Sequence, residues 1–357
     1  MNAALDRAGA QLAGEELAIG AADAWLKQQL PELRGAPKVT QYSGGASNWT
    51  YRLEYENDDL ILRRPPAGKK AKGAHDMGRE FRIQQALAPV FPFVPAMRAY
   101  CADEAVIGAE FYVMQRVAGI ILRKNLPRGV EPSRDDVRKL CTNALDTLIA
   151  LHRIDCGAAG LTQFGKGADY AQRQVEGWSR RLRDVPTWNV SRGAKITAWL
   201  AANVPTTERI CFTHNDFRFD NLVLDPNDLT RILGVLDWEL ATVGDPLMDL
   251  GNSLAYWVQA DDDFLARSTR RQPTHLSGML TRREVIEYYC GKMGFDPGDF
   301  AFYEVYGLFR LSVIAQQIYY RYHHRQTRNP AFRRFWLLVN YLHWRCHRAI
   351  ARARRNS

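Results

Sequence analysis

An aspartate, an asparagine and a second aspartate are spaced in this chain as phosphate transfer requires. Asp216 and Asn221 belong to one polar segment, and Asp237 follows after a short interval of apolar and turn-forming residues. Mg²⁺ takes oxygen ligands and keeps places for phosphate oxygens, so an amide and a carboxylate suit a metal–nucleotide complex better than zinc. A further carboxylate can accept a hydrogen bond from a hydroxyl and orient it toward a terminal phosphate. We therefore expect phosphoryl transfer to a hydroxyl, with Asp216 orienting that hydroxyl and Asn221 and Asp237 holding Mg²⁺.

The interval between Asn221 and Asp237 predicts a β-hairpin. Short apolar runs at 222–224 and 232–236 flank a cluster of turn-forming residues at 225–228. Pro, Asn and Asp fix or tolerate the backbone angles of a chain reversal. Residues at the open end of an antiparallel hairpin lie side by side, so Asn221 and Asp237 should converge on one spot.

Neighbouring polar residues divide into one catalytic candidate and three supporting ones. Arg218, two residues after Asp216, is placed to bind developing phosphate charge or the acceptor. We expect His214 to hydrogen-bond nearby backbone rather than to transfer protons, because the aspartate already fills that role. Asp245 and Asp249 are expected to cap or brace the loop and the helix that follows it.

These segments resemble the aminoglycoside phosphotransferase and choline kinase superfamily, whose fold is similar to that of protein kinases. More narrowly, 216–222 and 236–246 are similar to the kinase-like domain fused to, or encoded beside, certain acyl-CoA dehydrogenases, and 42–48 and 62–66 extend the likeness. Asn215 departs from the family pattern, which usually has glycine there. Asn tolerates unusual backbone angles better than most residues, so we expect an effect on rate rather than on reaction type.

The resemblance implies an α+β, protein-kinase-like fold with two lobes. A small antiparallel-sheet N-lobe, residues 1–115, would carry an N-terminal helix and bind the nucleotide. A larger, mainly helical C-lobe, residues 116–357, would carry the catalytic loop, the metal site and the acceptor pocket. Helical spacing of apolar residues agrees with this division and predicts helices at 15–30, 133–153, 170–184, 193–202, 283–293, 300–325 and 330–352.

The same resemblance assigns the phosphate contacts of ATP to a turn in the first half of the chain. This turn lies between strand-like segments at 38–42 and 49–55, and small residues there let backbone N–H groups approach phosphate. A glycine pair in a hairpin is otherwise an ordinary turn. The candidate nucleotide-binding residues of the turn are Gly44, Gly45, Ser47 and Asn48.

A cation and a carboxylate complete the expected phosphate site. Arg63 ends the strand-like run 60–63 where kinases usually place a phosphate-binding lysine, and Arg64 is the alternative cation. Glu80, in the helical stretch 78–87, is the expected partner of that cation. The alternative for Glu80 is an exposed helix glutamate.

The segment 111–119 resembles the superfamily hinge that contacts adenine. This implies backbone contacts from Gln115 and Val117, with Met114 lining the adenine pocket. An ordinary buried strand is the alternative interpretation of the same apolar run.

The composition fits a soluble globular protein with more than one lobe. The chain has 357 residues, of which 46% are hydrophobic and 24% charged. Neither an export signal nor a run of 18 apolar residues is present in the sequence, so we expect a cytoplasmic protein without membrane segments. The six cysteines contain no C-x-x-C pair, which favours reduced buried thiols.

Charge helps to choose the acceptor. The net charge is +9, and a CoA thioester, which carries several negative charges, prefers a basic cleft, whereas polycationic aminoglycosides need an acidic one. The sequence contains no recognised nucleic-acid module, so we do not expect nucleic acid as a partner. With the narrower resemblance, the charge favours a hydroxyacyl-CoA or hydroxy-acid acceptor and an acyl-CoA dehydrogenase as functional partner. Candidate acceptor contacts on one helix face, with ordinary surface or packing roles as the alternative, are Tyr170, Arg173, Gln174 and Trp178.

Two other functions remain open at this stage. One is a kinase for an aminoglycoside or an amino alcohol such as choline. The other is a catalytically silent nucleotide-binding protein that regulates a partner dehydrogenase, which the departures at Arg63 and Asn215 would explain.

Overall fold

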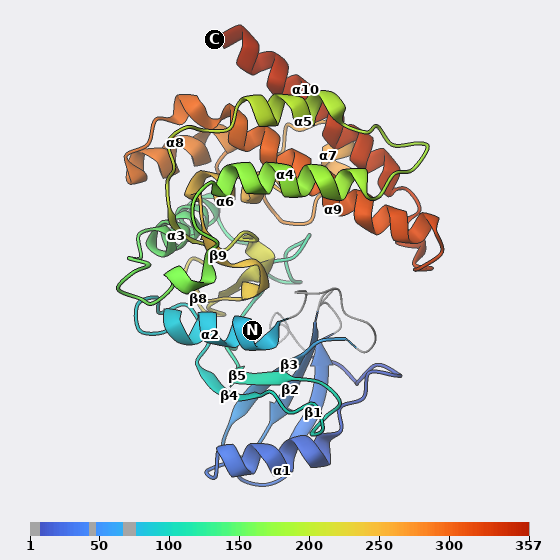
Figure 1. Cartoon of the computed structure of the whole chain (residues 1–357). Helices are drawn as coiled ribbons and strands as arrows, with labels where there is room; N and C mark the ends of the chain where they lie inside the picture. Colours follow the sequence, from blue (N-terminus) through green and yellow to red (C-terminus); the bar gives the residue numbers. More distant parts are fainter. Residues whose placement is uncertain (1–7, 43–47, 67–75, 357) are drawn as a thin grey trace.

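Alternating apolar residues in the first third of the chain build a five-stranded antiparallel sheet. The computed structural model describes residues 8–42, 48–66 and 76–356. The strands lie in the order β1-β2-β3-β5-β4, and Figure 1 shows this sheet between α1 and α2 in the small lobe. Their bounds are β1 Lys38–Tyr42, β2 Trp49–Glu54, β3 Asp59–Arg64, β4 Met97–Cys101 and β5 Phe111–Gln115.

Helices cover both faces of this sheet. Helix α1 (Ile19–Gln29) packs Leu26 against one face, which β3 lines with Leu60 and Leu62. Helix α2 (Met77–Leu87) covers the other face, where Met77 packs against Tyr112 and Met114 of β5. Because successive strand residues point to opposite faces, β3 and β5 present their remaining side chains, including Arg63, toward α2 and the large lobe.

Helix α2 is bonded to the large lobe as well. Nη2 of Arg79 donates to the carbonyl oxygen of Ala241 at 2.6 Å and to that of Phe164 at 3.4 Å. The α2 helix therefore lies between the two lobes, as Figure 1 shows.

The large lobe is mainly helical and has a core of its own. Helix α9 packs against both α6 and α10, and α4 lies alongside α9 (Figure 1). The predicted helices are present with ends shifted by a few residues. Their bounds are α3 Arg134–His152, α4 Tyr170–Arg183, α5 Ala194–Ala202, α6 Pro246–Ala255, α7 Phe264–Thr269, α8 Arg282–Met293, α9 Ala301–His323 and α10 Phe335–Asn356.

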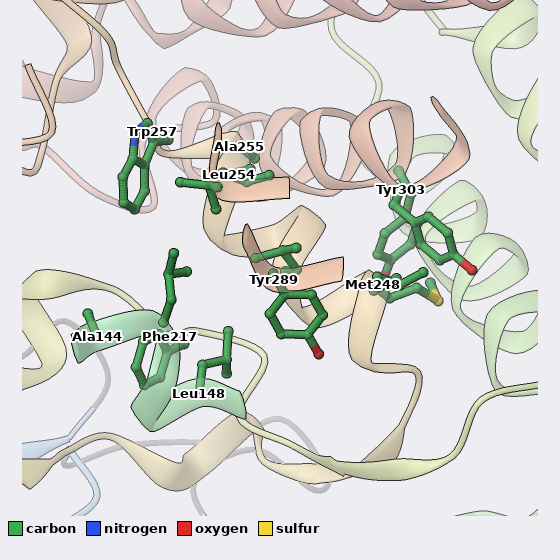
Figure 2. Packing of buried hydrophobic residues seen from close by; sticks show 14 of the residues in the cluster. Ala144, Leu148, Phe217, Met248, Leu254, Ala255, Trp257, Tyr289 and Tyr303 are labelled. Carbon is green, nitrogen blue, oxygen red and sulfur yellow. The ribbon is translucent and has the colours of Figure 1, made fainter. Parts of the chain in front are cut away.

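Two short antiparallel pairs lie on the side of the large lobe that faces the sheet. Strand β6 (Cys211–Thr213) pairs with β9 (Thr242–Gly244), and β7 (Leu222–Leu224) pairs with β8 (Ile232–Val235). The loop between β6 and β7 is anchored by the buried ring of Phe217, which lies beside Ala144 and Leu148 of α3 (Figure 2). The predicted α+β fold, with a small antiparallel-sheet lobe and a larger, mainly helical lobe, is confirmed.

Among the described residues no helix is both long and apolar enough to cross a bilayer. All six cysteines are free thiols, and five of them are buried.

Candidate active site

The predicted hairpin brings Asn221 and Asp237 together. Leu222 pairs with Val235, and the next step outward is the hydrogen bond from Leu236 N to Asn221 O at 2.8 Å. Asn221 ends the 3₁₀ turn η2 (Phe219–Asn221), and Asp237 follows directly after Leu236 with a φ of 70°. Both side chains line one cavity between the lobes.

Asp216 is fixed beside Asn221. The Nδ2 group of Asn221 donates to Asp216 O at 2.8 Å and to Asp216 Oδ2 at 3.1 Å. Arg218 approaches the same carboxylate at 3.3 Å. Burial raises the pKa of Asp216 to about 6, and the charge of Arg218 opposes this rise. The carboxylate oxygens are therefore held in place to accept a hydrogen bond from an acceptor hydroxyl.

We call residues 214–221, between β6 and β7, the catalytic loop. Asp249, a buried acid on α6, holds the backbone of this loop. Its carboxylate accepts hydrogen bonds from His214 N at 2.6 Å and Asn215 N at 2.9 Å, and lies 3.1 Å from Nε2 of His152. Burial alone would raise the pKa of Asp249, but the hydrogen bond with His152 and the nearby backbone donor bring it below its ordinary value. Asp245 caps α6 by accepting from Leu247 N and Met248 N. Both aspartates have the bracing roles predicted for them.

His214 also supports the loop. Its Nε2 lies 3.0 Å from the carbonyl oxygen of Leu236, and its Nδ1 accepts from Asp216 N at 3.2 Å. Burial lowers the pKa of His214, so the ring is neutral with its proton on Nε2. This arrangement bonds the catalytic loop to the strand that leads to Asp237.

Asn215 adopts the left-handed backbone conformation, with a φ of 63°. Glycine adopts this conformation at no steric cost, which fits the glycine that the family resemblance implies at this position. The Asn215 amide donates to Thr213 Oγ1 at 2.9 Å and to Leu240 O at 3.2 Å, and its oxygen accepts from Asn252 Nδ2 at 3.1 Å. The side chain is thus accommodated within a buried polar network and leaves the loop intact.

The N-lobe cation and its partner are Arg63 and Glu80. Arg63 Nη1 bonds to the Glu80 carboxylate, and both groups also contact the hydroxyl of Tyr112. Arg63 Nη2 then reaches Asp237 Oδ1 at 3.2 Å. Burial raises the pKa of Glu80, and the charge of Arg63 opposes this rise. The alternative cation, Arg64, instead donates to Ile107 O and stacks on Trp49, away from Glu80.

The cavity between the lobes has a volume of about 340 Å³. Met114, Gln115 and Val117 line it on the hinge side. The backbone N–H of Gln115 donates to Ala96 O at 2.8 Å. Asn48 lines the opposite edge and donates to Glu239 at 3.3 Å. The predicted contacts at Gly44, Gly45 and Ser47 fall outside the described residues.

The donor set fits Mg²⁺. The Nδ2 group of Asn221 donates to Asp216, so the amide oxygen of Asn221 remains available to a metal ion. Asp237 offers the carboxylate oxygen that Arg63 does not contact. Among the described residues neither oxygen has a hydrogen-bond donor. Two hard oxygens from residues that line one cavity suit a cation that keeps several positions for phosphate and water.

Sequence reasoning missed several contributors. Tyr112 lies within an apolar strand, so its type did not mark it as a site residue. Strand alternation nevertheless places it on the same face as Met114. Asp220 pairs with Arg218 at 3.2 Å, and Tyr256 lies under the Arg218 guanidinium at 4.5 Å. Asp220 stood inside the polar segment, whereas nothing in the sequence marked Tyr256.

All four predicted acceptor contacts on α4 have partners within the chain, and their contact with an acceptor stays a prediction. Tyr170 is buried, and its hydroxyl donates to Asn215 Oδ1 at 3.3 Å. Arg173 donates to Gly167 O at 2.9 Å. Gln174 and Trp178 are bonded to each other at 3.2 Å and lie against α9.

Comparison with known proteins identifies the family. The model of the phosphotransferase enzyme family, APH, matches residues 38–285. The chain belongs to this family. This phosphotransferase is 36% identical over 289 residues to acyl-CoA dehydrogenase family member 10 of Mus musculus, an alignment that covers 80% of the chain and 27% of the mouse protein. The chain therefore spans less than a third of the length of that relative.

Solved structures agree with the family. A Ralstonia eutropha JMP134 protein assigned as an aminoglycoside phosphotransferase superposes with a TM-score of 0.76 at 28% identity, covering 93% of this chain and 98% of that one. Choline kinase from Cryptosporidium parvum Iowa II superposes with a TM-score of 0.64 at 11% identity, covering 92% of this chain and 96% of that one, which is a likeness of fold alone. The predicted superfamily and enzyme class, a phosphotransferase acting on a hydroxyl group, are confirmed.

Proposed function

We propose that this phosphotransferase is an ATP- and Mg²⁺-dependent kinase for a hydroxyacyl-CoA or a hydroxy acid. The observation that carries the proposal is the placement of Asp216, Asn221 and Asp237 along one cavity, with Arg63 opposite them. ATP occupies this cavity with adenine against the hinge and its phosphates toward Arg63. When bound, Mg²⁺ would be held by Asn221 and Asp237 and would neutralise charge on the phosphate oxygens.

The residues of the chain then perform the transfer. Asp216 accepts the hydrogen bond of the acceptor hydroxyl and aims its oxygen at the γ-phosphorus. A bond forms between that oxygen and phosphorus as the bond to the bridging β–γ oxygen breaks, and the hydroxyl proton passes to Asp216. Arg218, between Asp216 and Asp220, lies close enough to oppose negative charge on the transferring group. The products are ADP and a phosphate ester.

Two observations favour the acyl acceptor. The mouse relative is named as an acyl-CoA dehydrogenase family member, and the net charge of +9 suits a polyanionic thioester. Phosphorylation turns a poor leaving hydroxyl into a better one, which prepares it for elimination or rearrangement. An acyl-CoA dehydrogenase is accordingly the functional partner that we propose.

The test is mass spectrometry of reactions that contain ATP, Mg²⁺ and a panel of 3- and 4-hydroxyacyl-CoA thioesters and free hydroxy acids. A gain of one phosphoryl group on an acyl compound, absent with Asp216→Ala, is expected. Kanamycin and choline are run in parallel, because the fold is shared with choline kinase. Phosphorylation of kanamycin or choline alone would refute the acyl acceptor.

A silent regulator that only binds nucleotide is the second candidate. The motivation for it, the departures at Arg63 and Asn215, is weakened by the contacts that both side chains make. Nucleotide binding without a product from any acceptor would favour the regulator.

A further inference from the structure

Asp220 is an acid of the active-site cavity that neither holds the metal nor orients the hydroxyl. It lies in the 3₁₀ turn η2 and lines the cavity between the lobes. Its Oδ2 lies 3.2 Å from Arg218 Nη2. Its Oδ1 is buried and has no hydrogen-bond partner among the described residues. A buried carboxylate oxygen without a partner costs free energy, so stability does not account for an acid at this position.

Arg218 is shared by two carboxylates through a single nitrogen. Its Nη2 lies 3.3 Å from Asp216 Oδ2 and 3.2 Å from Asp220 Oδ2. The ring of Tyr256 covers one face of the guanidinium, with the ring centre 4.5 Å from the guanidinium carbon. Because the two ion-pair distances are nearly equal, neither carboxylate holds the cation alone.

The turn that carries Asp220 is anchored in the large lobe. The backbone N–H of Phe219 donates to Gln272 Oε1 at 2.8 Å. The Phe219 ring is buried, and its centre lies 5.7 Å from that of Trp257. The backbone next to Asp220 is therefore fixed, which keeps the carboxylate beside Arg218.

Asp216 keeps one oxygen for the acceptor in this arrangement. Its Oδ2 accepts from Asn221 Nδ2 at 3.1 Å and faces Arg218, whereas its Oδ1 has no hydrogen-bond donor in the part of the chain that the structure describes. A guanidinium that has one carboxylate partner commonly forms two parallel N–H···O bonds with it. If Arg218 were paired with Asp216 alone, that geometry would occupy Oδ1.

We propose that Asp220 is a positioning residue, which shares Arg218 with Asp216 and so leaves Asp216 Oδ1 free to orient the acceptor hydroxyl. Arg218 keeps its other N–H donors for the transferring phosphoryl group. Asp220 acts through Arg218 and not through the reactants. The inference rests on the proposed function, because it assumes transfer to a hydroxyl held at Asp216, but it applies to any acceptor of that kind.

The kinetic test is a double-mutant cycle of Asp220→Asn and Arg218→Gln. Initial rates are measured at saturating ATP and Mg²⁺ with a 4-hydroxyacyl-CoA thioester, or with kanamycin or choline if one of these gains the phosphoryl group. Asp225→Asn is the matched control, because Asp225 lies in the following hairpin and pairs with Arg231 at 3.3 Å. Thermal unfolding and ADP affinity are measured for each variant to confirm that it is folded.

For Asp220→Asn we expect kcat to fall by about 10- to 100-fold, because the orienting oxygen becomes occupied, while KM for ATP changes by less than about twofold. In the Arg218→Gln background the same substitution should cause no further fall, since Asp220 acts through Arg218. Asp225→Asn should match the wild type. An unchanged kcat for Asp220→Asn, or effects of the two substitutions that multiply in the double variant, would overturn the inference.

A structural measurement tests the same inference without any acceptor. Crystal structures of the wild type and of Asp220→Asn, each with ADP and Mg²⁺, are compared at Arg218. We expect the guanidinium of the variant to approach both oxygens of Asp216, and a guanidinium that keeps its wild-type position would refute the inference. Failure of the proposed function looks different, because the wild-type protein would then phosphorylate none of the compounds. The position of Arg218 in the two crystals decides the role of Asp220 in that case as well.

Discussion

Arg63 Nη2 lies 3.2 Å from Asp237 Oδ1, so the cation of the small lobe directly contacts the carboxylate that we assign to the metal. The same guanidinium also bonds Glu80 and Tyr112 through Nη1. A planar fork can satisfy such separated partners at once, whereas a lysine ammonium is a single point charge. This geometry gives the arginine a function that the usual lysine cannot fully supply.

Arg63→Lys should therefore weaken nucleotide binding. We expect the Kd for ADP with Mg²⁺ to rise by roughly threefold to tenfold, because one charged hydrogen bond is lost. Isothermal titration calorimetry measures this effect. Arg64→Lys is the matched control, since Arg64 donates to Ile107 O and stacks on Trp49. Equal Kd values for Arg63→Lys and the wild type would contradict this role.

Replacing Asn215 separates backbone strain from hydrogen bonding. Asn215→Gly keeps the positive φ without strain but loses four side-chain hydrogen bonds, so we expect about 1 kcal/mol of destabilisation and retained turnover. Asn215→Val adds a β-branched residue at a φ it rarely adopts and should cost about 3 kcal/mol or more. Urea unfolding and turnover of both variants test this order. Equal stability and turnover of Asn215→Val and Asn215→Gly would refute the predicted order.

Asp216→Asn should remove activity and raise stability. The pKa of Asp216 is raised to about 6 by burial, so its ionised form destabilises the folded protein above that pH. The amide removes this cost, and we expect the free energy of unfolding to increase by about 1–3 kcal/mol at pH 8. The difference should shrink as the pH falls through 6 toward the ordinary value of 3.8. Chemical denaturation at several pH values measures it, and a variant less stable than the wild type at pH 8 would disprove the expectation.

Asp249→Asn should have the opposite effect. The pKa of Asp249 lies below its ordinary value, so its contribution to stability is complete above that value and is lost as the pH falls through the folded-state pKa. Loss of the charge leaves His152 and the loop N–H groups poorly paired, which should cost about 3–5 kcal/mol near neutral pH. Thermal unfolding and circular dichroism follow this change. Asp245→Asn, which retains an oxygen to cap α6, is the milder comparison.

The sequence predicted those parts of the site that lie close together in the chain. Asn221 and Asp237 converge because a local hairpin joins them, and the Arg63–Glu80 pair follows from a strand and the next helix. Asp249 lies 34 residues after Asn215 in the sequence, and only tertiary packing reveals from which N–H groups its carboxylate accepts hydrogen bonds. The pairing of Trp178 with Arg310 has no local signal at all, because α4 and α9 meet only in the folded lobe. Aromatic residues at helical spacing look the same whether or not a cation lies among them.

Two consecutive residues of α2 are bonded to different lobes. Arg79 holds the carbonyl groups of Ala241 and Phe164 in the large lobe, while Glu80 holds Arg63 of the sheet. In mechanical terms, α2 couples the sheet to the large lobe, because residues in a single turn of this helix are bonded to both. A wider cleft requires α2 to part from one of its two lobes and Arg63 to part from Asp237, so these bonds together limit how far the enzyme can open.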